Sequence, residues 1–252
     1  MDKLTIASYN IHKCVGLDKK FRPDRIIDVI KELNADVLAL QETDQRFGRC
    51  RGLLDLGYLK KETGFIPVPV QGKTTHSLGW HGNAIFLKDG HIDTLVQIKL
   101  PGVEPRGALL VELSLPAGPL RIITAHFGLL RHSRQRQAQE IINILRQRPI
   151  MPTLMLGDLN EWRRGRGSSL RNLDMFFDFT QHALPSFPSL FPIFALDRVL
   201  SYPLELIETI EIHSSRLARI SSDHLPIKAR INLVKAHKYL ATHKMQAKDI
   251  QL

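Results

Sequence analysis

Polar side chains that could bind a cation or a phosphate occur repeatedly where an apolar segment of strand length begins or ends. Rigid strands fix the position of such groups, while the adjoining loops leave them accessible, so strand ends are common places for reactive residues. The residues placed in this way are Asn10, Glu42, His126, Asp158, Asn160, Asp223 and His224.

The oxygen-bearing members of this set have complementary chemistry. Glu42 and Asn10 offer oxygen ligands suited to magnesium, which uses one or two carboxylates and keeps several waters. Asp158 could accept a proton from an attacking water, and Asn160 could orient that water or donate to a phosphoryl oxygen. Each residue also has an ordinary alternative, because Glu42 could be a solvated loop residue and 157–160 could be a simple turn.

The two histidines could stabilise negative charge. His126 and His224 can donate hydrogen bonds to a developing anion or a leaving oxygen, although a single histidine is more often a hydrogen-bonded interior residue. Either Asp197 or Asp223 could fix the tautomer of His224. Together with a hard cation, these groups suit hydrolysis of a phosphate ester or diester.

The elements that must position these residues alternate between strand-like and helix-like patterns along the whole chain, which predicts one α/β domain. Pro23 begins one helical pattern, and Ser133 is the predicted N-cap of another. Residues 109–115 alternate most clearly between apolar and polar side chains. The predicted strands are 4–10, 36–40, 83–87, 109–115, 121–127, 153–156, the neighbourhood of Val199, 206–212 and 226–234. We expect a catalytic domain over residues 1–234 and a basic tail, a frayed helix or loose segment, over 235–252.

The amino-acid composition limits the classes of binding partner and the cellular locations that we expect. The 252 residues are 43% hydrophobic and 24% charged, with a formal net charge of +10. This charge favours polyanionic partners, namely nucleic acid, anionic lipid headgroups or small phosphorylated molecules. Cys14 and Cys50 alone cannot form a disulfide framework, and no secretory signal or membrane span is visible. We therefore expect a cytoplasmic protein, with peripheral membrane association as an alternative.

Six short motifs occur in an order that matches a known superfamily. The motifs are Tyr9-Asn10, Gln41-Glu42, Thr124-Ala125-His126, Gly157-Asp158-Leu159-Asn160, Leu196-Asp197-Arg198 and Ser222-Asp223-His224. In this respect the chain resembles the endonuclease/exonuclease/phosphatase superfamily. It is similar to a bacterial branch that also carries sequences like Asn10-Ile11-His12-Lys13, Pro105-Arg106-Gly107-Ala108 and Ser186-Phe187-Pro188.

The resemblance implies a four-layer sandwich of two mixed β-sheets flanked by helices, with the site at one edge. It implies that Glu42 is the main ligand of Mg²⁺ or Mn²⁺, with Asn10 and Asp223 nearby. It also implies that Asp158 activates or aligns water and that Asn160 positions it. Three further roles follow: His126 contacts the scissile phosphate, His224 stabilises the transition state, and Asp197 orients His224. We expect Arg106, Arg163 and Arg164 to bind the substrate phosphate, since arginine favours bidentate phosphate contacts.

Departures from the family pattern limit the choice of substrate. His12 and the segment 126–129 differ from the corresponding motifs of abasic-site endonucleases, and Asn10 lacks the preceding Trp of inositol phosphatases. We expect a monomeric, magnesium-dependent phosphodiesterase that acts on nucleic acid. A phospholipid or inositol phosphate phosphodiesterase or phosphatase is the alternative, followed by a non-catalytic phosphate-binding member.

Overall fold

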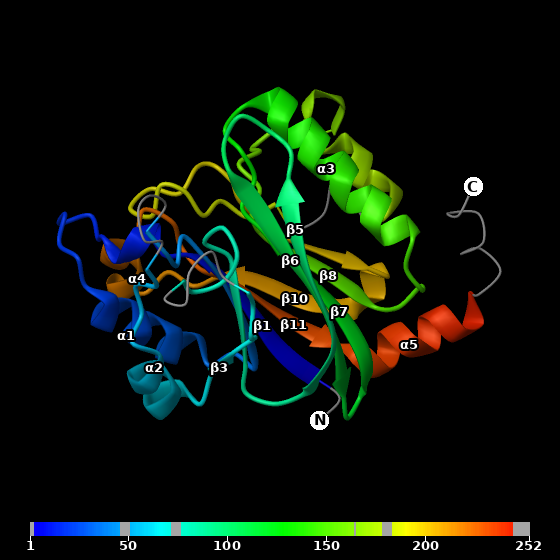
Figure 1. Ribbon diagram of the computed structural model, residues 1–252, viewed down its shortest axis with the longest axis horizontal. Helices are drawn as coiled ribbons and strands as arrows, with labels where there is room; N and C mark the ends of the chain where they lie inside the picture. The colour runs from blue at the N-terminus through cyan, green and yellow to red at the C-terminus, as the bar shows by residue number, and fades with distance from the viewer. Residues whose placement is uncertain (1–2, 46–50, 72–76, 164, 178–182, 244–252) are drawn as a thin grey trace.

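Two β-sheets packed face to face form the centre of the protein, and helices cover their outer faces (Figure 1). The structure is a computed structural model that describes residues 3–45, 51–71, 77–163, 165–177 and 183–243. No helix within these residues is long and apolar enough to cross a membrane.

The first sheet has six strands in the order β10-β11-β1-β2-β4-β3. Its two central strands, β1 and β2, run parallel with Asn10 opposite Gln41, so both strands end at the same edge of the sheet. Their neighbours β11 and β4 run antiparallel to them. The strand bounds are β1 (Lys3–Asn10), β2 (Val37–Gln41), β3 (Ile66–Pro67), β4 (Ala84–Leu87), β10 (Ile207–Ile212) and β11 (Ile227–Asn232).

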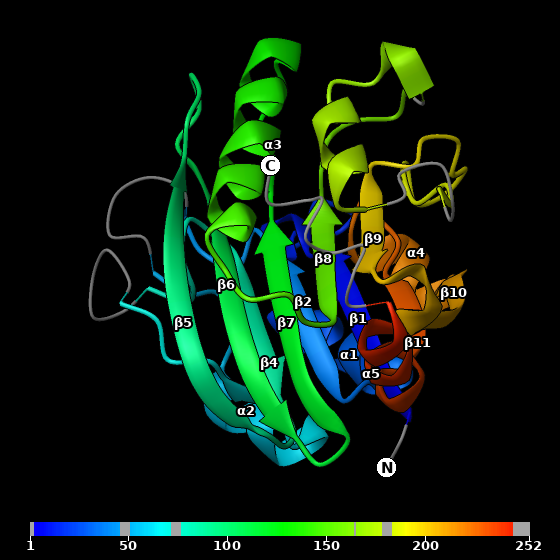
Figure 2. The same cartoon turned by 90° about the vertical axis from the view of Figure 1, so that its right-hand side faces the viewer.

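The second sheet has five strands in the order β5-β6-β7-β8-β9. Here β7 and β8 form the parallel pair, while β8 and β9 run antiparallel with Asp158 opposite Asp197. The bounds are β5 (His91–Leu100), β6 (Arg106–Leu115), β7 (Gly118–Ala125), β8 (Thr153–Asp158) and β9 (Asp197–Tyr202). Figure 2 shows these strands side by side.

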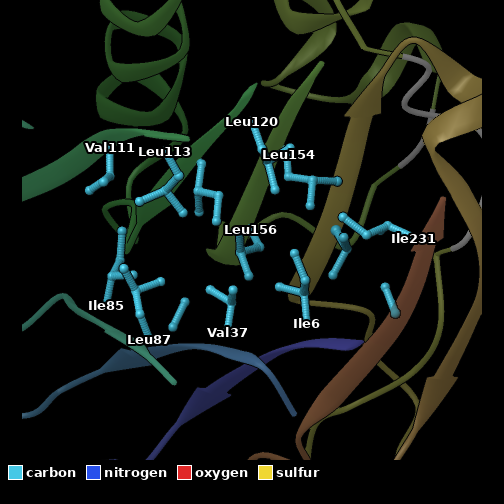
Figure 3. Close-up of a cluster of buried hydrophobic side chains, with 14 of the residues drawn as sticks. Ile6, Val37, Ile85, Leu87, Val111, Leu113, Leu120, Leu154, Leu156 and Ile231 are labelled. Atoms are coloured by element: carbon cyan, nitrogen blue, oxygen red, sulfur yellow. The ribbon is translucent and has the colours of Figure 1, made fainter. Parts of the chain in front are cut away.

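Apolar side chains from both sheets meet in the central core. Alternate residues of β6, Leu109, Val111 and Leu113, point into this layer, as their period of two requires. They face Ile6, Val37 and Ile85 among others from the first sheet (Figure 3). Burial of this surface is the main force that holds the sheets together, and its alternation fixes the register of the strands.

The outer faces of both sheets carry their own cores. The helices α1 (Pro23–Leu33), α2 (Leu56–Thr63) and α4 (Arg216–Ser221) supply apolar residues to the outer core of the first sheet. The helix α3 (Arg131–Arg146) and the 3₁₀ turn η3 (Arg171–Met175) cover the second sheet. Helix, sheet, sheet and helix make four layers, which confirms the predicted fold class. Short 3₁₀ turns lie at η1 (His12–Cys14), η2 (Gly165–Gly167) and η4 (Leu204–Leu206).

Some local expectations differ from the structure. The N-cap of α3 is Leu130, which has no side chain able to cap, and Ser133 lies buried inside the helix, so the predicted Ser133 cap is wrong. The segment after the last strand begins as an ordered helix, α5 (Leu233–Thr242), capped by the Asn232 side chain. The division at 234/235 thus falls inside a helix.

The α5 helix lies at the end of the sandwich opposite the strand ends that carry Asn10 and Asp158 (Figure 1). His237 of α5 donates a hydrogen bond from Nε2 to the carbonyl oxygen of Pro119, near the start of β7. His126 follows the other end of that strand, seven residues after Pro119, which is about 23 Å away at roughly 3.3 Å per residue. The lysines of α5, Lys235 and Lys238, therefore lie far from the candidate site (Figure 1).

Candidate active site

Asp158, the last residue of β8, lies at the centre of a cluster of polar side chains from both sheets. Its Oδ2 accepts a hydrogen bond from Asn10 Nδ2 at 3.0 Å and lies 3.4 Å from His126 Nε2. The same oxygen is 3.7 Å from His224 Nε2. The parallel pairs β1–β2 and β7–β8 end at this edge, which brings these residues together across more than two hundred positions of sequence.

His224 is held by a buried chain of hydrogen bonds. Its Nδ1 is 2.8 Å from Asp197 Oδ2, and Ser186 Oγ donates to the same carboxylate oxygen at 2.5 Å. The ring of Phe187 packs against the imidazole with 4.9 Å between ring centroids. An Nδ1–H that donates to Asp197 leaves Nε2 directed toward Asp158. The structure thus pairs Asp197, and not Asp223, with His224.

Asn160 is fixed by the backbone around it. Its main chain adopts a left-handed conformation with φ of 51°, which Asn tolerates better than most residues. Its backbone N–H donates to Asp158 Oδ1 at 3.0 Å, and its side-chain Nδ2 donates to the carbonyl of Phe127 at 3.0 Å. Neither of these two hydrogen bonds uses the side-chain oxygen of Asn160.

Burial and neighbouring charge shift the pKa values of the central pair in the same direction. Burial, which disfavours the ionised carboxylate, raises the pKa of Asp158 to about 6. Burial alone would lower the pKa of His224, but the charges of Asp197 and Asp158 outweigh it and raise that pKa to about 10. Near neutral pH the site therefore holds a carboxylate ready to accept a proton beside an imidazolium ready to donate one.

The Glu42 carboxylate fits the role of a cation ligand. It follows β2, next to Asn10 on the parallel neighbour, and its Oε2 is buried without a hydrogen-bond partner. The Lys13 ammonium forms an ion pair with it, with 3.3 Å between Nζ and Oε2. A buried carboxylate oxygen that lacks a donor is poorly solvated, and a hard cation with waters would satisfy it. Within the described residues, no group of three or more His, Cys, Asp or Glu side chains forms a metal cage.

Asp223 lies on the exposed side of this cluster. Its Oδ1 is 3.7 Å from His12 Nδ1 and 3.4 Å from Ser222 Oγ. Ser222 Oγ also donates to the carbonyl of Asn10 and accepts from the backbone N–H of His224. The segment is therefore tied to the end of β1, while a metal contact of Asp223 stays a prediction.

The three arginines predicted to bind phosphate have different surroundings. Arg106 is buried, and its Nε and Nη2 donate to Glu104 Oε2 at 3.1 and 2.8 Å. Arg163 is exposed, and its guanidinium stacks 5.1 Å from the centre of the Trp162 ring. Arg164 lies outside the described residues. A phosphate contact of any of them stays a prediction.

Sequence reasoning assigned no role to several residues of this cluster. Ser186, Phe187 and Ser222 hold Asp197, His224 and Asn10 in place, and Lys13 lies against Glu42. Ser222 stands inside the motif Ser222-Asp223-His224, and the other three stand in Asn10-Ile11-His12-Lys13 and Ser186-Phe187-Pro188. For Lys13 and Ser222, proximity in sequence to Asn10 and to Asp223 was the available signal, whereas Ser186 and Phe187 carried no such signal.

A comparison with protein families decides the membership of this chain. The profile of the Endonuclease/Exonuclease/phosphatase family matches residues 7–224. The chain belongs to this family. The match spans every residue of the cluster from Asn10 to His224, and it confirms the resemblance of the sequence motifs. A search of curated proteins gives no significant match.

Solved structures of several family members share the fold at low sequence identity. An endonuclease/exonuclease/phosphatase from Beutenbergia cavernae is 19% identical, with a TM-score of 0.68 over 94% of this chain and 73% of that one. TDP2 from D. rerio, complexed with a single-strand DNA product, is 17% identical, with a TM-score of 0.68 over 92% and 100%. A mannosyl-6-phosphatase from Bacteroides thetaiotaomicron is 18% identical, with a TM-score of 0.70 over 90% and 99%.

Proposed function

We propose that this protein is a magnesium- or manganese-dependent phosphodiesterase that hydrolyses P–O bonds by in-line attack of water. The observation that carries the proposal is the convergence of Asn10, His126 and His224 on one buried carboxylate, Asp158. Family membership supports the general class, a phosphoric ester hydrolase.

In the proposed reaction, Asp158 Oδ2 accepts the proton of the attacking water. Its raised pKa makes it a stronger base than an exposed aspartate, while burial excludes competing solvent. Asn10 Nδ2 donates to the same oxygen and fixes its direction. The hydrogen bond from Asn160 Nδ2 to the Phe127 carbonyl fixes the orientation of the amide. The side-chain oxygen of Asn160 then orients the water.

The two imidazoles stabilise the charge that develops on phosphorus. His224 is held as a cation by Asp197, so it donates from Nε2 to a phosphoryl oxygen. His126, which is also buried beside Asp158, donates to a second oxygen or to the leaving group. A cation bound by Glu42 and Asn10 would supply charge neutralisation at the phosphate.

Hydrolysis of bis-p-nitrophenyl phosphate, with magnesium and with a chelator, tests the proposal. We expect activity that the chelator abolishes and that Asp158→Asn and His224→Ala each lower by at least about a hundredfold. A Lys235→Ala variant, changed at the far end of the sandwich, is the matched control and should retain activity. Activity insensitive to chelator, or retained by both site variants, contradicts the proposal. Absence of activity in the wild type also contradicts it and favours a non-catalytic phosphate-binding protein.

Nucleic acid is one substrate class that a specific observation favours. The net charge is +10, and the fold is shared with TDP2 from D. rerio in its complex with a DNA product. Binding of single-stranded DNA that weakens steeply with salt is the expected result for this class. Absence of binding at low salt would exclude it.

A further inference from the structure

Exposed apolar side chains gather on the loops that surround the catalytic edge. The most exposed are Val103, Phe191 and Ile193, at 80%, 79% and 67%. Val103 lies in the loop after β5, and Phe191 and Ile193 lie in the loop before β9. Further exposed apolar residues lie in the loops after β7 and β8. All of these loops are at the edge of the sheet that carries Asp158. We call this set the apolar rim: Val103, Leu129, Leu130, Trp162, Leu190, Phe191 and Ile193.

Hydrogen bonds join the first loops of the apolar rim into one surface. The backbone N–H of Leu129 donates to Glu104 Oε1 at 2.8 Å, which places the loop of Val103 against the loop that follows His126. The buried Arg134 then donates to the carbonyl of Leu129 at 2.6 Å and lies 3.4 Å from Glu161, the neighbour of Trp162. These loops are therefore adjacent and fixed.

Aromatic contacts continue the apolar rim to the catalytic histidine. The Trp162 ring packs on Phe194 with 5.8 Å between centroids. Phe194 forms a backbone bridge with Phe187, whose ring packs on His224. The turn between the two phenylalanines carries Phe191 and Ile193 outward. A surface that touched this turn would thus lie close to the reacting groups.

The turn that carries Phe191 is anchored rather than loose. Arg219 Nη1 donates to the carbonyl of Leu190 at 2.9 Å, and Ser189 Oγ donates to the carbonyl of Arg219 at 2.9 Å. Figure 1 shows this yellow segment beside α4. The protein therefore holds several apolar side chains in contact with water, which is energetically unfavourable. Exposed apolar patches of this kind typically mark interaction sites.

Positive charge surrounds the apolar rim. Segments 101–106, 127–136, 161–171 and 187–194 contain only two acidic residues, Glu104 and Glu161. Both are paired internally, with Arg106 and Arg134. The exposed arginines of these segments are Arg131, Arg136, Arg163, Arg166 and Arg171. Exposed apolar side chains within a ring of unopposed cations complement an anionic bilayer, which offers acyl chains beneath negative headgroups.

We propose that the apolar rim inserts into the surface of an anionic lipid bilayer and presents a lipid headgroup phosphodiester to Asp158. This inference rests on the proposed function and names its substrate class. Five of the seven rim side chains are aliphatic. Aliphatic side chains suit acyl chains, whereas single-stranded nucleic acid is bound by cationic grooves whose apolar contacts are mainly aromatic side chains that stack on the bases. The bilayer is therefore the favoured partner.

The test is co-sedimentation of the full chain with vesicles of equimolar phosphatidylcholine and phosphatidylglycerol. We expect the protein to bind these vesicles, and pure phosphatidylcholine much less. The double variant Phe191→Ser/Ile193→Ser should lower the partition coefficient at least about tenfold, because each side chain loses apolar area to bury. Val234→Ser is the matched control: Val234 is also exposed but lies on α5, at the opposite end.

Activity on bis-p-nitrophenyl phosphate separates this inference from the proposed function. The double variant should hydrolyse that soluble diester as the wild type does, yet lose hydrolysis of vesicle phosphatidylglycerol, and its thermal midpoint should be unchanged. The inference is overturned if the wild type does not bind anionic vesicles, or if the double variant binds them equally well. Binding of single-stranded DNA in place of vesicles, weakened by Trp162→Ala, would overturn it in favour of nucleic acid.

Discussion

Asp158 and Asp197 are direct partners in the antiparallel register of β8 and β9, and one imidazole lies against both carboxylates. His224 Nδ1 is 2.8 Å from Asp197, and its Nε2 is 3.7 Å from Asp158. Two buried carboxylates in neighbouring strands would repel each other without a cation between them. The imidazolium therefore stabilises the pair and couples the proposed base to the proposed proton donor.

Ser186 is expected to act as a positioning residue through Asp197. Its hydroxyl donates to the carboxylate oxygen that also receives His224 Nδ1. We expect Ser186→Ala to lower kcat roughly tenfold, because a hydrogen bond to a charged group contributes about 1.5–3 kcal/mol. Ser186→Thr should restore part of the loss. An unchanged kcat in both variants would show that Asp197 holds its position without the serine.

The activity should have a bell-shaped dependence on pH. Asp158 must be ionised to accept a proton, so kcat/KM should rise as pH passes about 6. His224 must be protonated to donate, so kcat/KM should fall as pH passes about 10. Because Asp158 and His224 interact, the apparent pKa values read from the two limbs describe the pair together and not each residue separately. His224→Gln should lose the alkaline limb, and an alkaline limb preserved in that variant would contradict the assignment.

The same histidine should make folding stability depend on pH. The pKa of His224 is raised to about 10 in the folded protein, from 6.5 for an ordinary histidine. A raised pKa stabilises the fold fully below pH 6.5, and that contribution is lost as pH rises through 10. The thermal midpoint of the wild type should therefore fall between pH 7 and 10 more steeply than that of His224→Gln. Parallel curves for the two proteins would contradict the prediction.

The sequence could predict the layers of the fold because they depend on simple periodicity. Leu109, Val111 and Leu113 alternate into the central core, so β6 is visible from the pattern alone. By contrast, β5 was missed: it is an edge strand with one neighbour, and most of its residues are partly buried or exposed. The helix α2 was missed because Leu59 is its only buried residue.

Some residues of the candidate site could likewise be predicted from the sequence, and others could not. Acidic, amide and histidine residues such as Asp158 and His224 are recognisable because polar side chains directly beside apolar strands stand out in the sequence. Ser186 and Phe187 are not recognisable, since serine and phenylalanine are common in loops and turns. Their contacts with Asp197 and His224 depend on how a connection returns to the sheet edge. No local pattern encodes that return.

Lys13 is expected to weaken cation binding at Glu42. Its ammonium lies 3.3 Å from Oε2, a buried oxygen that makes no hydrogen bond, so a bound cation must compete with this ion pair. Because the lysine is partly exposed, the effect should be modest, and Lys13→Met should tighten magnesium binding by about two- to fivefold. Isothermal titration calorimetry can measure this change, with Lys20→Met as the control. Weaker binding by Lys13→Met would show that Lys13 supports the cation site.

Arg134 should be essential for the stability of the loops around the site. Both Arg134 and Glu161 are buried, and the guanidinium also donates to Ser169 Oγ and to the Leu129 carbonyl. Arg134→Met keeps the volume of the stem but leaves Glu161 buried without its counter-ion, which typically costs about 3–5 kcal/mol. Ser169 still donates to Glu161, so the loss should lie at the lower end of that range.

The double variant Arg134→Met/Glu161→Gln tests the cause of that loss. If an uncompensated carboxylate is responsible, the second substitution should recover a large part of the free energy of unfolding, measured by urea denaturation. Arg136→Met, an exposed arginine on the same helix, should change that free energy by less than about 0.5 kcal/mol. If the double variant is as unstable as Arg134→Met alone, the lost packing and backbone hydrogen bonds of Arg134 carry the effect, and the ion pair with Glu161 does not.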